Sequence, residues 1–150
     1  MNQFAHYIFD KFPQVKVYFQ NNIQNNEDYY LFEKEWLNCY NYKKPFSFVF
    51  DTTNVGMINI KYVYKLTKFI SDLKEKIKNK PNEFNFLQYS IIIVNNWYIK
   101  HLLNITFMIQ KPIAPVYIVE KNYHINKLYH KLENKLLIDE TEIIIILPSV

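Results

Sequence analysis

Hydrophobic positions along the chain follow two different spacings. Val15, Val17 and Phe19 alternate with Lys16 and Tyr18, and this spacing of two predicts a half-buried strand over 15–19. Four further short apolar runs also have the length of strands, namely 46–50, 90–94, 116–119 and 142–147. Elsewhere hydrophobic residues recur every three or four positions, which predicts amphipathic helices. These helices cover 29–42, 59–79, 98–109 and 125–136.

The longest predicted helix, 59–79, separates its two faces clearly. Its inward stripe is Val63, Leu66, Phe69 or Ile70, Leu73 and Ile77. Its outward stripe is Lys61, Lys65, Lys68, Asp72 and Glu75. Such a separation predicts a helix that packs on one side and meets solvent on the other.

The order of strands and helices predicts the fold class. Short apolar strands that alternate with amphipathic helices are typical of a mostly parallel sheet covered by helices. We therefore expect a single α/β domain over 1–150, with about five strands and four helices. The first 13 residues form an N-terminal extension, in which 4–12 is either an added edge strand that turns back through Pro13 or a short helix.

Composition then removes the function that this β/α order would otherwise favour. The chain of 150 residues contains one glycine, Gly56, whereas loops that bind phosphate need several glycines for close backbone approach. The turns that follow the predicted strands are 51–56, 95–97 and 120–122, and none matches a dinucleotide or phosphate-loop motif. We therefore expect no classical dinucleotide or nucleoside-triphosphate site.

The net charge of +4 does not by itself indicate a nucleic-acid partner. All 18 basic residues are lysines and they are spread along the chain, as expected for solvated helix surfaces. Without arginine there is no bidentate reader of guanine, so we expect no sequence-specific nucleic-acid binding. Abundant Lys, Asn, Ile, Tyr and Phe are typical of an AT-rich genome, either cellular or that of a large DNA virus.

Residues that commonly bind metals or form disulfides are sparse. Cys39 is the single cysteine and is expected to be a buried thiol. The four histidines show no pair at helical metal-ligand spacing; they are His6, His101, His124 and His130. We expect no metal and no cofactor. No secretory signal pattern and no membrane-spanning apolar run is visible, so a cytoplasmic location is expected.

Asp51 is the strongest candidate for chemistry, because it closes the predicted strand 46–50. Phosphotransfer domains place a carboxylate there, but they need acidic, Lys and Ser/Thr partners at later strand ends. A turn or capping role for Asp51 is therefore favoured. An enzyme that uses Asp51, Thr53 and Lys61 remains the weakest of the functional hypotheses.

The segment FSFVFDTTNV (46–55) and the helix that follows it resemble STAS domains, the family of the anti-sigma-factor antagonists. The segments 90–97 and 111–119 also resemble the core of the CRAL-TRIO lipid-binding domains. The resemblance is one of pattern, over about 14–137. It implies a docking module without catalysis. The antagonists carry a phosphorylatable serine at the start of the long helix, where this chain has NIKY (59–62), so their switch is not expected.

Two functional hypotheses follow. The first is a non-catalytic module that binds a protein partner or itself, through exposed tyrosines or through an edge strand at 15–19. The tyrosines considered are Tyr7, Tyr18, Tyr30 and Tyr98. The second is a small carrier of a lipid or other apolar ligand, with a cavity lined by Trp36, Trp97, Tyr29, Tyr30, Tyr40 and Tyr98. The candidate interaction residues are Asp51, Thr53, Asn54, Gly56, Asn59, Lys61, Asn95, Asn96, Trp97 and Tyr98.

Overall fold

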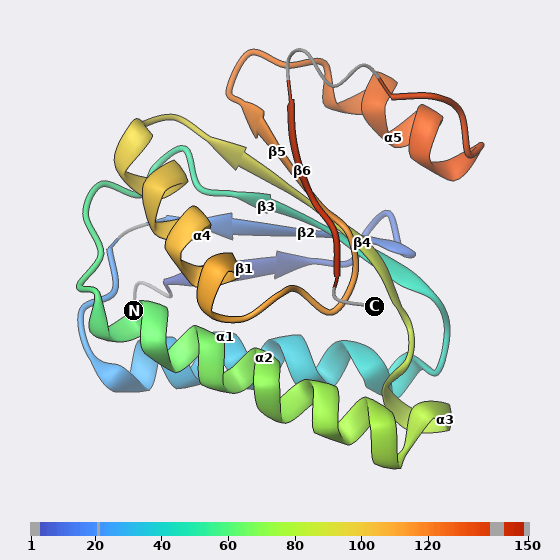
Figure 1. The fold of residues 1–150 in the computed structure, drawn as a ribbon, viewed down its shortest axis with the longest axis horizontal. Helices are drawn as coiled ribbons and strands as arrows, with labels where there is room; N and C mark the ends of the chain where they lie inside the picture. The colour runs from blue at the N-terminus through green and yellow to red at the C-terminus, as the bar shows by residue number, and fades with distance from the viewer. Residues whose placement is uncertain (1–3, 21, 139–142, 149–150) are drawn as a thin grey trace.

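A computed structural model describes residues 4–20, 22–138 and 143–148 of the chain. Within these residues six strands form one sheet, and their spatial order follows the chain (Figure 1). The strands are β1 Ala5–Ile8, β2 Gln14–Phe19, β3 Phe46–Asp51, β4 Leu87–Val94, β5 Val116–Glu120 and β6 Ile143–Ile146. The helices are α1 Asn26–Asn38, the 3₁₀ turn η1 Cys39–Tyr42, α2 Lys61–Asn79, α3 Pro81–Phe84, α4 Trp97–Ile109 and α5 Ile125–Glu133.

The strand directions confirm a mostly parallel α/β sheet. Strands β2 to β5 are parallel, and the outer strands β1 and β6 pair antiparallel with β2 and β5. The sheet has six strands rather than about five, because the N-terminal segment is a strand and not a helix. The predicted edge position of 15–19 is wrong, since β2 lies between β1 and β3. Glu142, in the predicted final strand, lies outside the described residues.

The order of the parallel strands places three helices on one face of the sheet. Each step from β2 to β5 moves one strand further in the same direction. Right-handed crossovers that all advance in one direction keep their helices on the same side. Accordingly α1, α2 and α4 share one apolar cluster with that face, whereas α5 packs on the opposite face (Figure 1).

Aromatic rings fill the space between β3 and the helices. Phe46, Phe48 and Phe50 project from β3 toward this side and are buried. The Trp36 ring of α1 lies 5.1 Å from that of Phe48 and 5.1 Å from that of Phe69 on α2, both at steep angles. Edge-to-face pairs of this kind add to the stabilisation from burial. Trp36 therefore joins the sheet to both helices.

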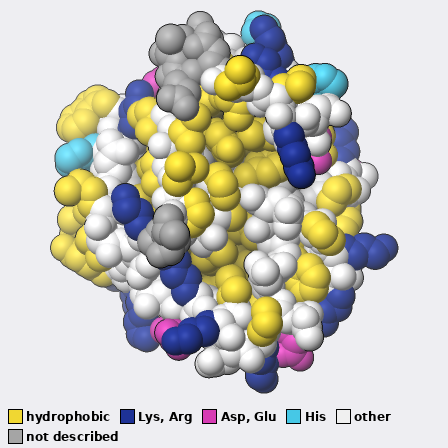
Figure 2. Space-filling model, turned by 45° about the vertical axis from the view of Figure 1, so that its right-hand side comes forward, with side chains coloured by type: hydrophobic (Ala, Val, Ile, Leu, Met, Phe, Trp, Pro, Cys, Tyr) yellow, Lys and Arg dark blue, Asp and Glu magenta, His cyan; other side chains and the backbone are white. Residues whose placement is uncertain are grey.

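The opposite face of the sheet is covered over only part of its width. Leu128 of α5 packs with Val49, Ile91 and Val119 of the central strands. Toward the β1 edge this face becomes polar, and Lys16 is only half-buried. Figure 2 brings the right-hand side of the molecule forward and shows hydrophobic side chains in a hollow, with lysine side chains around them.

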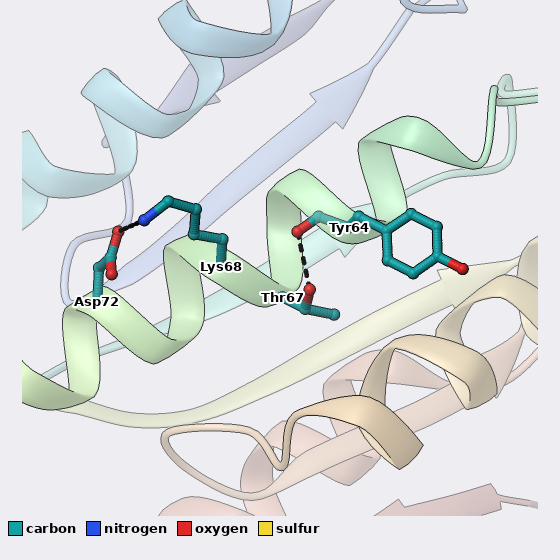
Figure 3. A network of polar contacts seen from close by, with 4 residues as sticks. All are labelled: Tyr64, Thr67, Lys68 and Asp72. Atoms are coloured by element: carbon teal, nitrogen blue, oxygen red, sulfur yellow. Dashed lines mark hydrogen bonds and ion pairs between the residues drawn. The ribbon is translucent and has the colours of Figure 1, made fainter.

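Helix α2 keeps the polar stripe that its spacing predicts. Lys68 and Asp72 form an exposed ion pair of 3.1 Å one turn apart (Figure 3). Thr67 is buried, and its hydroxyl donates a 2.8 Å hydrogen bond to the Tyr64 carbonyl. The ring of Tyr64 stands out from the helix, away from the ion pair. The buried face is wider than predicted, because Tyr62 and Thr67 join the predicted inward stripe.

Two lysines adopt the left-handed backbone conformation that usually favours glycine. Lys43 ends the 3₁₀ turn with φ 54°, and its N–H donates to the Tyr40 carbonyl. Lys135, just after α5, also has φ 54°. A residue with a side chain pays about 1 kcal/mol in this conformation.

No helix among the described residues is both long enough and apolar enough to cross a membrane.

Replacing Phe48 with alanine should lower the stability of the protein more than a substitution at an exposed position. Phe48 has no exposed surface and touches rings on both sides of the aromatic layer. The free energy of unfolding should fall by about 3–5 kcal/mol. Denaturant titration followed by far-UV circular dichroism measures this change. Met108→Ala, at an exposed position, is the control and should stay within about 0.5 kcal/mol of the parent chain.

Candidate functional site

Most of the predicted interaction residues gather where β3 and β4 end. Asn95 and Asn96 follow β4, and their side-chain amides donate to the carbonyls of Thr53 and Val55, both at 3.2 Å. One turn further, the Tyr98 hydroxyl donates a 2.8 Å hydrogen bond to the Ile58 carbonyl. The turn after β4 and the first turn of α4 are therefore joined to the loop after β3.

Asp51 makes local hydrogen bonds at the end of β3. Its Oδ1 accepts from the Thr53 backbone N–H at 3.0 Å and from the Thr53 hydroxyl at 2.7 Å. This is the hydrogen-bond pattern of an Asx turn. Lys61, the third residue of the enzyme hypothesis, holds its ammonium group 5.1 Å from the centre of the Tyr62 ring. The structure thus brings Asp51 and Thr53 together and directs Lys61 toward an aromatic ring.

Gly56 and Asn59 also make structural hydrogen bonds, one to the segment after β2 and one at the start of α2. The Gly56 N–H donates to Asn22 Oδ1 at 3.0 Å, and Asn59 Oδ1 accepts from the Lys61 N–H at 2.9 Å. Asn54 is exposed. Ligand crevices in parallel sheets form where the strand order reverses, so that neighbouring loops diverge. From β2 to β5 the order does not reverse, and the neighbouring loops bind each other instead.

The outer surface of α4 carries an exposed stripe that includes one predicted residue, Trp97. We call Trp97, His101, Asn104 and Met108 the outer stripe of α4; all four are exposed and their spacing of 4, 3 and 4 places them on one side of the helix. Trp97 is 75% exposed and Met108 is 82% exposed. The Trp97 ring lies 6.2 Å from the ring of His101. The stripe thus presents two large apolar side chains to solvent on one side of a single helix.

The charges around the outer stripe are mainly positive. Helix α4 contains Lys100 and no acidic residue, and the loop 52–60 has no charged residue. Helix α2 begins with Lys61, and no acidic residue follows before Asp72. Glu120 is the nearby exception, and it is held by Lys100 at 2.8 Å.

Two apolar cavities of about 100 and 120 Å³ lie between the sheet and the helices α1, α2 and α4. Of the aromatic residues predicted to line a cavity, Trp36 borders the first cavity and Tyr29 the second. Trp97, Tyr30, Tyr40 and Tyr98 border neither. The interior next to α4 is therefore not completely filled.

The tyrosines predicted to form an exposed contact patch do not do so together. Tyr7 is buried, and its hydroxyl donates to the Phe32 carbonyl at 2.8 Å, so its predicted exposure is wrong. Tyr18 and Tyr98 are half-buried, and Tyr30 is exposed on α1. The four tyrosines lie on separate elements and form no common patch. Hydrophobic spacing alone does not show whether a tyrosine ring is buried or exposed.

The buried thiol and one carboxylate show the effect of removal from water. Burial raises the pKa of Cys39 to about 12, which keeps the thiol protonated and weakly nucleophilic at neutral pH. Burial also raises the pKa of Glu35, whose Oε2 has no hydrogen-bond partner among the described residues. Glu35 borders a more polar hollow of about 400 Å³ with Phe9, Asn38 and Tyr42.

Among residues 4–20, 22–138 and 143–148, no three His, Cys, Asp or Glu side chains are grouped so that they could hold a metal ion. Comparison with known proteins finds no match to any family model, any curated protein or any solved structure.

Sequence reasoning missed most of the outer stripe. Hydrophobic spacing predicts the helix at 98–109 but does not mark His101, Asn104 and Met108 as surface residues. A signal was present, because Met108 and Ile109 make this helix hydrophobic beyond the single face that the sheet requires. A short surface helix that is apolar on several sides has more than one surface to cover.

Asn96 should contribute more to stability than its neighbour Asn95. Its Oδ1 caps α4 by accepting from the Ile99 N–H at 2.9 Å, and its amide holds the Val55 carbonyl. Asn96→Ala should lower the free energy of unfolding by about 1–2 kcal/mol. Asn96→Asp keeps the cap and should lose less, as should Asn95→Ala. Equal losses in all three variants, measured by denaturant titration, would contradict the capping role.

Gly56 should tolerate a side chain although it is the chain's single glycine. Its φ is not positive, and an added Cβ would meet the Asn22 side chain at 3.7 Å, an ordinary contact. Gly56→Ala should raise the free energy of unfolding by about 0.4–1 kcal/mol, because it restricts the unfolded chain. Thermal unfolding tests this, and a clear loss of stability would show that the loop needs the glycine. Gly56→Pro is the contrasting variant, since it removes the N–H that binds Asn22.

Proposed function

We propose that this protein is a non-catalytic docking module, built on a STAS-like scaffold, that binds a partner protein through the outer stripe of α4. The observation that carries the proposal is the exposure of Trp97 and Met108 on one side of a single helix. Exposed tryptophans and methionines are enriched in protein interfaces, where large rings and flexible thioethers fill the partner's pockets.

The surroundings of the stripe support a rigid docking platform. Asn96 caps the helix, Tyr98 fastens its first turn to the loop after β3, and Lys100 pairs with Glu120 at the end of β5. On the inner side of the helix, Ile99, Leu102 and Phe107 are buried against the sheet and its other helices. A helix held on three sides loses little conformational freedom when a partner binds.

Charge defines the kind of partner that fits. Lys111 is exposed just after α4, Lys61 is exposed at the start of α2, and α4 itself has no acidic residue. A partner with an apolar centre and carboxylates around it would therefore be complementary. A second copy would oppose two positive surfaces, since the whole chain carries a net charge of +4. We therefore assign an acidic protein surface rather than a homodimer.

The test uses a photo-crosslinking amino acid placed at position 101, inside the stripe. In a native lysate it should form an adduct with one protein whose contact surface is acidic. Excess unlabelled protein should suppress the adduct, and the double variant Trp97→Ser/Met108→Ser should suppress it at least tenfold less effectively. Loss of a tryptophan hot spot commonly costs about 2 kcal/mol or more, which accounts for this ratio.

The control places the same crosslinker at position 30, where Tyr30 is exposed on α1. Equal adducts from positions 30 and 101 would show unspecific capture and contradict the proposal. Adducts only with a second copy would replace the acidic partner by self-association. Binding of the parent chain, but not of the double variant, to anionic lipid vesicles would assign the stripe to a membrane surface instead.

A further inference from the structure

The two apolar cavities adjoin one another beneath α4. Five residues border both of them, and these are Phe19, Phe32, Thr52, Leu66 and Leu103. The first cavity extends from these residues toward the start of β4 and β5, past Ile92, Phe107 and Ala114. The second extends toward the start of α2, past Val63 and Leu102. The pair therefore has the form of one site with two lobes that share a wall.

The walls offer almost nothing that could hold water. Within the part of the chain that the structure describes, no charged side chain borders either lobe. The Thr52 hydroxyl donates to the Ile93 carbonyl at 2.7 Å, and the Thr106 hydroxyl donates to the Leu102 carbonyl at 2.8 Å. Ser90 adds a single hydroxyl to the first lobe. A cavity water needs two to four polar partners, so apolar cavities of this kind stay dry and take up small apolar molecules.

We propose that this two-lobed cavity binds a small, uncharged hydrocarbon or aromatic molecule of about six to ten non-hydrogen atoms. Each lobe, at about 100 and 120 Å³, is close to the size at which engineered apolar cavities accept benzene. A full-length lipid does not fit, because pockets for larger ligands are usually about 300 Å³ or more. An ion does not fit either, because its charge would lie among apolar walls without a partner.

A route into the site lies along its helical wall. Leu66 of α2 and Leu103 of α4 border both lobes and are half-buried, as is Ile113 beside the first lobe. The wall formed by α2, α4 and the segment before β5 therefore reaches the surface at these side chains. Rotamer changes of exposed side chains are fast, so a small ligand can enter without unfolding of the sheet.

The experiment compares toluene with benzoate, which have similar shapes but differ in charge. Toluene should shift the methyl resonances of Leu66 and Leu103 in a saturable way, whereas benzoate should not. At a toluene concentration ten times its Kd, the unfolding equilibrium constant should fall about tenfold. Xenon under pressure should perturb the same methyl groups, because it occupies dry apolar cavities.

The matched variants fill the cavity from inside or change the helix from outside. Leu103→Phe adds volume to the shared wall and should weaken toluene binding at least tenfold, whereas Ile109→Val, at an exposed position at the end of α4, should leave binding unchanged. Should Leu103→Phe fold poorly, Ala114→Leu fills the first lobe instead. Absence of saturable shifts in the parent chain, or equal binding by the filled variants, would overturn the proposal. Neither result bears on docking, which is tested through Trp97 and Met108.

Discussion

The strand order is the constraint on which the rest of the structure depends. Because β2, β3, β4 and β5 follow one another across the sheet in chain order, each right-handed crossover places its helix on the same face. That face must then bury the apolar sides of α1, α2 and α4 together, and the rings of β3, α1 and α2 fill the space between the layers. Among the described residues, the opposite face is covered by the short helix α5.

The same constraint explains why the carboxyl ends of the strands form no open crevice. A crevice needs neighbouring crossovers that leave toward opposite faces. Here they leave toward the same face, so the loops after β3 and β4 meet and exchange hydrogen bonds through Asn95 and Asn96. The polar residues at this edge hydrogen-bond to neighbouring loops. The cavities and the exposed apolar residues lie instead on the inner and outer sides of α4.

Helix α4 is therefore the element that carries apolar residues on two opposite sides. Its inner residues Leu102, Leu103 and Phe107 border the cavities, while Trp97 and Met108 face outward. Helix α2 has only one apolar side to bury, and its outer side carries the Lys68–Asp72 pair. Helix α2 therefore only covers the sheet, whereas α4 presents apolar residues both to the interior and to the surface.

Much of the sheet and the helices α1, α2, α4 and α5 could be predicted from spacing alone, because buried strands such as β3 and stripes such as that of α2 leave a direct periodic signal. The sequence could not show that β2 is an interior strand, since an alternating pattern reports which face is buried and not which neighbours are paired. Nor could it show that Tyr7 is buried, because a tyrosine can cover its hydroxyl with a distant carbonyl such as that of Phe32. Cavities depend on how side chains from several strands, helices and loops pack together, and no local sequence pattern shows this.

The low glycine content of the chain affects the conformational entropy of its unfolded state. The chain builds its left-handed turns at Lys43 and Lys135 rather than at glycine, and Gly56 occupies an ordinary conformation. Every other position carries a side chain, which narrows the range of backbone conformations open to the unfolded chain. Folding therefore sacrifices less backbone entropy per residue than it would in a glycine-rich chain of this length. The left-handed conformation of Lys43 and Lys135 costs some free energy in the folded state. The smaller loss of backbone entropy on folding offsets part of this cost.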